Sequence, residues 1–277
     1  MTHVRATAKP FLKWAGGKRR LLAQYDPHWP EFSGTYREPF VGSGAVFFHL
    51  QPQQSQLADI NPELVNAYLC VRDCLPELET TLAAHRDLHS HDYYYATRAL
   101  SPQDLNSVER AARLIYLNKT CFNGLYRENS RGNFNVPIGK YKNPSILQSD
   151  VLRAASAALQ GVDIELAPFW EVGDRAQPGD FIYFDPPYYP LSSTSSFTAY
   201  TRYTFGETEQ IQLRDLFADL QQRGISAAVS NSDCARIREL YAGFKLIEIE
   251  AGRAINSKGD RRGQIKELLI LNYRSRA

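Results

Sequence analysis

Hydrophobic and polar positions along the first 60 residues predict strands that alternate with helices. Apolar runs predict strands at 36–40 and 55–59, and a glycine turn leads into a short apolar helix at 45–50. Asn61-Pro62 then places a capping side chain and a proline where the next helix begins. Since such alternation is typical of parallel sheets, the start of the chain predicts an α/β fold.

The end of the chain returns to this alternation after a different middle part. Helical patterns, including one at 108–117, dominate the middle up to Asn118. The stretch 122–143 is rich in Gly, Asn and Arg, and its turn signals predict a hairpin or paired loops. The later elements that we predict are strands at 162–166, 180–184, 226–230, 244–250 and 267–273, and helices at 207–223 and 233–241.

Together these patterns predict an α/β core with an insert. We expect residues 1–60 and 149–277 to form the core, and residues 61–148 to form a mainly helical domain that carries a β-hairpin. The composition, with 43% hydrophobic and 22% charged residues, is ordinary for a soluble globular protein. Because no run of apolar residues is long enough to span a membrane and no secretory signal is evident, we expect a cytoplasmic protein with no membrane partner.

The four cysteines indicate reduced thiols rather than a disulfide framework. Cys70, Cys74, His85 and His89 loosely resemble a zinc-finger spacing, but their central gap is ten residues long and no hairpin signal precedes them. We therefore expect a helix with packed thiols, and no metal.

The net charge of +2 is unevenly distributed along the chain. The stretch 118–142 contains five Lys or Arg residues and one acidic residue, and the stretch 251–277 contains seven Lys or Arg residues and two acidic residues. Two basic stretches on an otherwise acidic chain indicate a polyanionic partner.

The motif with the most chemical content is Asp185-Pro186-Pro187-Tyr188, directly after the apolar strand at 181–184. Ligands of α/β sheets bind at the carboxyl ends of strands. One reaction that these groups would serve is methylation of an exocyclic amine, which needs acceptors for the protons of the amine. Asp185 supplies a carboxylate, and Pro186 holds a carbonyl rigidly. The ring of Tyr188 offers a face on which a base can stack.

Two further motifs are consistent with a nucleoside cofactor. Phe40-Val41-Gly42-Ser43-Gly44 lies between a strand and a helix, and Asp59 ends the next strand, where an acid can bind ribose hydroxyls. Position 47 is Phe rather than a third glycine, which disfavours NAD. The segment 11–18 lacks the spacing of a phosphate-binding loop, yet Trp14 and Lys18 lie beside paired glycines and could close over an adenosine and a carboxylate.

In this order, the segments resemble the DNA adenine methyltransferase (Dam) family, the alpha-type adenine-specific DNA methyltransferases. The matching segments are spread over nearly the whole chain. The matching runs are 11–18, 38–47, 58–61, 123–141, 181–188 and 197–200, with a looser match at 230–233.

The resemblance implies a Rossmann-like catalytic core that uses S-adenosyl-L-methionine and releases S-adenosyl-L-homocysteine. The insert would be the target-recognition domain, and Phe197–Tyr200 would lie beside a flipped adenine. The residues that would bind the cofactor are Trp14, Lys18, Phe40, Gly42, Gly44, Asp59 and Asp185.

The basic segment of the insert resembles the part that enters the major groove in family members reading GATC. Arg127 suits a bidentate contact to guanine, and Leu125 and Pro137 suit a thymine methyl. Phe122, where the family usually has Tyr, is a candidate aromatic wedge. We also expect Asn123 and Tyr141 at the DNA. The residues expected to hold phosphates are Lys119, Arg131, Lys140 and Lys142, with a second basic loop at 253–264.

Three alternatives remain open on the sequence. Asp-Pro-Pro-Tyr also serves amine or amide methylation of RNA or protein, an NAD-dependent enzyme is opposed by the missing glycine, and a non-catalytic DNA-binding protein is opposed by the intact motifs. The leading interpretation is a bacterial or phage-encoded enzyme, monomeric in solution, that methylates the 6-amino group of adenine in duplex DNA.

Overall fold

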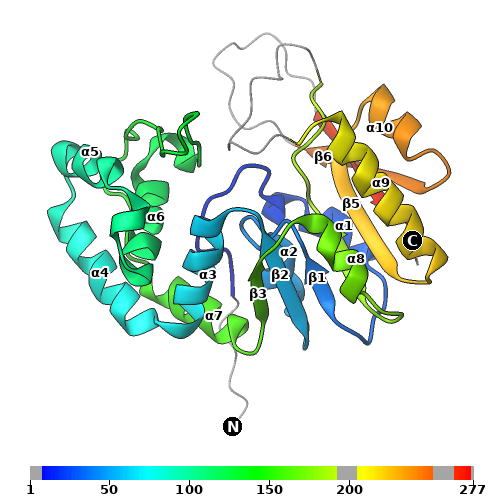
Figure 1. Ribbon diagram of the computed structural model, residues 1–277, viewed down its shortest axis with the longest axis horizontal. Coiled ribbons are helices and arrows are strands. Elements are labelled where there is room, and N and C mark those ends of the chain that lie inside the picture. The colour runs from blue at the N-terminus through cyan, green and yellow to red at the C-terminus, as the bar shows by residue number, and fades with distance from the viewer. Residues whose placement is uncertain (1–7, 192–204, 252–264, 276–277) are drawn as a thin grey trace.

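The computed structural model describes residues 8–191, 205–251 and 265–275, and its centre is a seven-stranded sheet (Figure 1). The strands lie in the spatial order β3-β2-β1-β4-β5-β7-β6. Neighbours from β3 to β5 are parallel, and β7 runs antiparallel between β5 and β6. The bounds are β1 Tyr36–Glu38, β2 Ser55–Asp59, β3 Asp163–Leu166, β4 Phe181–Phe184, β5 Ser226–Ser232, β6 Lys245–Ala251 and β7 Ile265–Leu271. The α/β prediction is confirmed: β2 has its predicted range, and each end of the other strands lies within two residues of the predicted end.

The strand β4 is apolar throughout because both faces of the sheet are buried at this position. Side chains of a strand alternate between faces. In β4, Phe181 and Tyr183 join one hydrophobic cluster, whereas Ile182 and Phe184 join the cluster on the other face. A strand of a parallel sheet that is covered on both faces has a continuous apolar sequence, which explains the residues at 181–184.

The helices of the core cover these two faces. The first face carries the side chains of α1 and α2, and the second face carries those of α8, α9 and α10. The bounds are α1 Leu22–Tyr25, α2 Ala45–Leu50, α8 Val172–Arg175, α9 Glu207–Gln222 and α10 Ala235–Leu240. Short 3₁₀ turns are η1 Lys18–Arg20, η2 Asp26–His28, η3 Pro102–Asp104, η4 Phe122–Gly124 and η5 Phe169–Glu171.

The middle of the chain forms a helical lobe beside the sheet, on the side of β3 (Figure 1). Its helices are α3 Pro62–Asp73, α4 Leu75–Leu88, α5 His91–Ala99 and α6 Ser107–Thr120, and α7 Ser149–Leu159 follows. Asn61 caps α3 as predicted, because its side chain accepts hydrogen bonds from the amides of Glu63 and Leu64.

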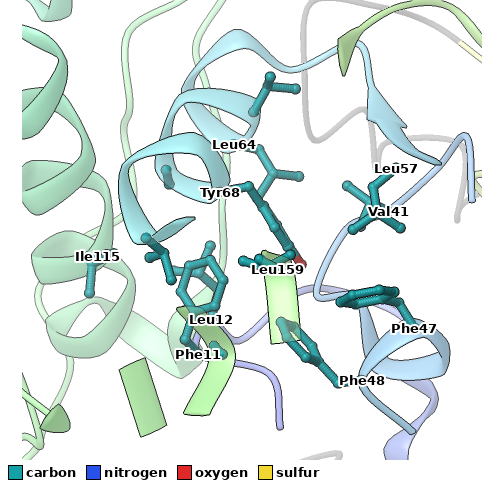
Figure 2. Packing of buried hydrophobic residues seen from close by; sticks show 14 of the residues in the cluster. Phe11, Leu12, Val41, Phe47, Phe48, Leu57, Leu64, Tyr68, Ile115 and Leu159 are labelled. Carbon is teal, nitrogen blue, oxygen red and sulfur yellow. The ribbon is translucent and has the colours of Figure 1, made fainter. Parts of the chain in front are cut away.

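One apolar cluster joins the lobe to the sheet. Figure 2 shows Tyr68 of α3 beside Phe48 of α2, and Leu64 and Ile115 belong to the same cluster as Phe11. The Phe11 and Tyr68 rings meet edge to face with centroids 4.9 Å apart. The division into a core and a target-recognition domain at residues 61 and 148 stays a prediction.

The segment 121–148 takes the form of paired loops. Two isolated antiparallel bridges, Cys121 with Ile138 and Glu128 with Phe134, hold its two sides together. Throughout 121–148, all of which the structure describes, there is no regular strand. Polar side chains and turns dominate this segment. It therefore has few alternating apolar residues that a regular strand could bury.

The residues that resembled a zinc-finger spacing have ordinary packing roles. Cys70 is buried, His85 stacks on Tyr116 at 4.8 Å, and His89 Nδ1 lies 2.9 Å from the Tyr116 hydroxyl. In the described ranges, no group of three or more His, Cys, Asp or Glu side chains is arranged to hold a metal ion. The same ranges contain no helix long and apolar enough to cross a membrane.

Candidate active site

The candidate site lies at the carboxyl edge of the sheet, where β1 and β4 are neighbours. From β1 the chain proceeds to β2 and β3 on one side, and from β4 it proceeds to β5 on the other. Such a reversal of strand order opens a crevice in α/β sheets. Here a cavity of about 1360 Å³ is lined by the ends of β1, β2 and β4 and also by residues of the insert.

The structure brings most of the motif residues to this cavity. The predicted site residues on its wall are Trp14, Lys18, Phe40, Gly42, Asp59, Asp185, Pro186, Pro187, Tyr188 and Arg131. Gly44 is absent from the wall and packs beneath it, where a Cβ would lie 2.7 Å from the Tyr68 hydroxyl.

Asp185 is held on one side only. Lys18 Nζ lies 2.9 Å from Asp185 Oδ1, and the Ser230 hydroxyl donates to the same oxygen at 2.7 Å. The Tyr183 hydroxyl in turn donates to Ser230 Oγ at 3.0 Å, within the sheet. Among the described residues no donor contacts Oδ2, so this oxygen is available to accept a proton from a ligand.

Lys18 is a buried cation, with 2% of its side chain exposed. Its ammonium donates to the Gly16 carbonyl at 2.6 Å and lies 4.6 Å from the centre of the Tyr188 ring. Burial of an ammonium is costly unless it is paired and hydrogen-bonded. The pairing with Asp185 satisfies this requirement and fixes both groups.

A buried amide relay fixes the backbone of the Asp-Pro-Pro-Tyr loop. Gln210 Nε2 donates to the Pro187 carbonyl at 3.0 Å, and Asn231 Nδ2 donates to Gln210 Oε1 at 3.0 Å. Asn231 Oδ1 accepts from the amide of Tyr189 at 3.0 Å. The Pro187 carbonyl is therefore engaged with the protein, and Gln210 and Asn231 are supporting residues that the sequence analysis missed. The run 230–233 was noted there only as a loose match.

The glycine loop approaches Trp14 too closely for any other residue. Gly42 has φ +46°, and a Cβ there would lie 2.9 Å from Trp14 Cδ1. A positive φ and such a close approach both favour glycine. The Tyr68 hydroxyl donates to the Gly42 carbonyl at 3.1 Å, which ties the loop to α3.

Asp59 is oriented by backbone amides at the end of β2. The amide of Asn61 donates to Oδ1 at 3.0 Å, and the amide of Gly42 donates to Oδ2 at 3.3 Å. Burial raises the pKa of Asp59 to about 6, and these amides oppose that shift. Each oxygen retains a second lone pair, which can accept a hydroxyl.

Glu38 is a buried carboxyl on the cavity wall that the sequence analysis did not single out. The Tyr36 hydroxyl donates to Oε2 at 2.7 Å, and the Phe47 amide donates to the same oxygen at 3.2 Å. Burial raises the pKa of Glu38 to about 8. In the structure Glu38 ends β1, as Asp59 ends β2, but the predicted strand 36–40 placed Glu38 in its middle, so the signal used for Asp59 did not identify it.

Aromatic side chains form an apolar wall beside these polar groups. Phe40 stacks on Phe169 with centroids 5.3 Å apart, and Phe205 meets Phe40 edge to face at 5.6 Å. Ile60, just after Asp59, also lines the cavity and is 37% exposed. A flat apolar group that enters the cavity could contact these surfaces next to Asp59.

The N-terminal segment is fastened to the insert. The Asn118 side chain accepts from the Lys13 amide at 2.9 Å, and it donates to the carbonyls of Lys13 and Gly124 at 2.7 and 3.0 Å. Gly124, with φ +65°, packs directly on the Lys13 side chain. The N-terminal segment and the insert loop are therefore one connected structure.

Most predicted DNA-contacting residues are exposed on this loop. Phe122 is 49% exposed, and its amide donates to the Pro137 carbonyl at 2.8 Å. Arg127 is exposed, with Nε held at 2.7 Å by Asn135 Oδ1. Asn123, Arg131, Pro137, Lys140 and Lys142 are exposed as well, whereas Leu125 is only half-exposed.

One of these residues, Lys119, is more enclosed than a phosphate contact suggests. Lys119 is half-buried, and its Nζ donates to Gln148 Oε1 at 2.9 Å. Burial, with the nearby charges of Lys13 and Lys9, lowers the pKa of Lys119 to about 8. Tyr141 is 38% exposed, and Lys13 Nζ lies 4.8 Å from the centre of its ring. The predicted segments 197–200 and 253–264 lie outside the described residues.

Comparison with known proteins agrees with this geometry. The family model of D12 class N6 adenine-specific DNA methyltransferases matches residues 14–255. The chain is 42% identical to a Type II methyltransferase of Lactococcus lactis subsp. cremoris, covering 96% of this chain and 95% of that protein. It is 41% identical to a Type II methyltransferase of Methanocaldococcus jannaschii, covering 96% and 99% of the two chains. It is 36% identical to a DNA adenine methylase of Haemophilus influenzae, covering 95% and 93%. The chain therefore belongs to the D12 class of N6 adenine-specific DNA methyltransferases.

Proposed function

We propose that the enzyme transfers a methyl group from S-adenosyl-L-methionine to an adenine that is flipped out of duplex DNA, within the sequence GATC. The observation that carries this proposal is the single cavity shared by Asp185–Tyr188, the glycine loop and the insert. An acceptor base and a cofactor need one enclosed space, and a DNA-reading loop at its edge would deliver the base.

The residues on the wall fit the proposed cofactor. Asp59 is oriented to accept ribose hydroxyls, and Phe40 and Ile60 offer apolar surface for the adenine ring. Gly42 and Trp14 form a close-packed floor that a side chain at position 42 would disrupt. When bound, S-adenosylmethionine supplies an electrophilic methyl group; it requires no metal.

Asp185 and Pro186 are assigned to the acceptor amine. The lone pair of an exocyclic amine is delocalised into the ring, so acceptors for its protons favour charge development on nitrogen. Asp185 Oδ2 accepts one proton, since Oδ1 is held by Lys18 and Ser230. Gln210 occupies the Pro187 carbonyl, which leaves the Pro186 carbonyl as the second acceptor. The Tyr188 ring supplies the stacking face.

The loop 122–141 is assigned to the DNA. Its exposed Phe122 suits the gap that a flipped base leaves, and Arg127 is held ready for a bidentate contact to guanine. The assignment to GATC rests on the resemblance of this loop. Since its substrate is chromosomal or phage DNA, we place the enzyme in the cytoplasm, and we expect it to act as a monomer.

The test is transfer of labelled methyl groups to matched duplexes. One duplex contains GATC, one contains the same bases scrambled, and one lacks adenine; RNA and bulk protein serve as other acceptors. We expect label in N6-methyladenine from the GATC duplex alone. Transfer to adenine at another site refutes the assignment of the loop, and transfer only to RNA or protein refutes the whole proposal. Replacing the target adenine by 2-aminopurine tests flipping, which should raise its fluorescence on binding.

A further inference from the structure

The antiparallel strand β7 brings a carboxylate to the active site from the far end of the chain. In the register of β5 and β7, Glu267 is opposite Ser232, at the end of β5. Because β7 runs antiparallel, its beginning lies at the same edge as the carboxyl ends of the parallel strands. Glu267 is therefore placed beside the Asp-Pro-Pro-Tyr loop, although 79 residues separate it from Tyr188.

Glu267 contacts two residues of the proposed machinery at once. The Tyr188 hydroxyl donates to Glu267 Oε2 at 2.6 Å, and Lys18 Nζ lies 3.9 Å from the same oxygen. Only 18% of the Glu267 side chain is exposed. A hydrogen bond from a hydroxyl to a carboxylate is roughly twice as strong as one between neutral groups.

The placement of Glu267 on the strand sets it apart from its neighbours. Side chains of a strand alternate, and Leu269 and Leu271 join the buried cluster on the same face as Glu267. Lys266 points to the other face and pairs with Glu248 at the surface. Thus a carboxylate interrupts an apolar series at the position where the strand contacts Tyr188. Burial of a charge is unfavourable without partners, so the sheet tolerates Glu267 because Tyr188 and Lys18 are there.

Two polar contacts with described residues bear on the orientation of the Tyr188 ring. One face of the ring lies against the Lys18 ammonium, 4.6 Å from the ring centre. The hydroxyl is the polar group of this side chain, and it donates to Glu267. Glu267 therefore helps to fix the plane of the ring, and hence the plane in which a base would stack on it.

We infer that Glu267 is a positioning residue for methyl transfer, which fixes the stacking face of Tyr188 and shares the ammonium of Lys18 with Asp185. This inference rests on the proposed roles of Asp185 and Tyr188. Glu267 acts through these two side chains and touches neither the acceptor base nor the cofactor. Its loss should therefore slow the transfer step while leaving the affinities for DNA and cofactor nearly unchanged.

The test compares Glu267→Gln, Tyr188→Phe and the double variant in single-turnover methylation of a GATC duplex. Each single variant should lose about tenfold in rate, equivalent to about 1.4 kcal/mol. Because both changes weaken one linkage, the double variant should be about as slow as the slower single variant, rather than about a hundredfold slower. The KM values for DNA and cofactor should stay within about twofold of wild type.

Glu250→Gln is the matched control, since Glu250 is an exposed carboxylate on the neighbouring strand β6. It should retain the wild-type rate. A wild-type rate for Glu267→Gln, multiplicative losses in the double variant, or a change confined to KM would each overturn the inference. If Glu267→Gln does not fold, Tyr188→Phe alone must show the tenfold loss, and a wild-type rate there overturns it. An inactive wild-type enzyme, or an active Asp185→Ala variant, refutes instead the function proposed above.

Discussion

The indole of Trp14 stacks on the phenol ring of Tyr126, with centroids 5.1 Å apart and planes inclined by 23°. Trp14 belongs to the N-terminal segment of the core, and Tyr126 belongs to the loop of the insert. Both line the cavity. The stack makes the insert part of the cavity wall that we propose faces the cofactor, so a change in the loop 122–141 should alter the affinity for the cofactor.

Tyr126→Leu should therefore weaken cofactor binding in the absence of DNA. Without its stacking partner Trp14 loses a contact worth about 0.5–1.5 kcal/mol, which predicts a Kd raised by roughly 2- to 12-fold. Calorimetric titration with S-adenosylhomocysteine measures the change. Tyr95→Leu, in a half-exposed ring of α5 outside the cavity, is the control and should bind like wild type. Equal affinities of all three proteins would contradict a role for the stack.

Because of Glu38, the stability of the enzyme should fall as the pH rises from about 4.5 to about 8. Burial raises the pKa of Glu38 to about 8, from an ordinary value of about 4.5. Between these values the folded protein keeps a proton that the unfolded chain has released. The contribution of Glu38 is thus fully present below about pH 4.5 and is lost as the pH rises through about 8, by at most about 1.4 kcal/mol per pH unit.

Glu38→Gln removes this ionisation while preserving the shape of the side chain. We expect the free energy of unfolding of the variant, relative to wild type, to increase from pH 5 to pH 9. Urea unfolding at pH 5, 7 and 9 measures it, with the exposed Glu250→Gln as control. A difference that stays constant across this range would show that Glu38 does not titrate there.

The order of strands and helices was predictable because the sheet is buried on both faces. An apolar run such as 181–184 and a cap such as Asn61 are local signals, and tertiary packing did not override them. The pairing within the insert loop was less predictable. Turn signals at 123–124 and 131–132 fix where the chain reverses, but only two isolated bridges form between its sides.

The candidate site was predictable where one short motif supplies the chemistry, as in Asp185–Tyr188. Supporting residues gave no such signal. Gln210 is an ordinary polar residue of an amphipathic helix, and it becomes part of the site only because α9 packs where its amide reaches Pro187. Glu267 depends in the same way on the antiparallel insertion of β7, which the strand pattern alone does not specify.

Asp185→Ala should abolish methyl transfer and leave DNA binding largely intact. The carboxylate is assigned to the acceptor amine, whereas the predicted DNA contacts lie on the insert loop. We expect the single-turnover rate to fall by at least about 10³, equivalent to about 4 kcal/mol. Fluorescence anisotropy with a labelled duplex should give a Kd within about threefold of wild type. A comparable loss of DNA affinity would mean that Asp185 has another role.

Arg127 and Lys140 should differ in what they contribute to DNA recognition. Arg127 is assigned to a guanine edge, so Arg127→Ala should cost about 1–3 kcal/mol on GATC and relax selection at the guanine position only. Lys140 is exposed and assigned to a phosphate, so Lys140→Ala should weaken binding to all sequences alike and reduce the salt slope by about one unit. Binding to GATC and to four single-base variants, at several salt concentrations, separates the two effects. A uniform loss for Arg127→Ala would place that side chain on the backbone and refute its assignment to a base.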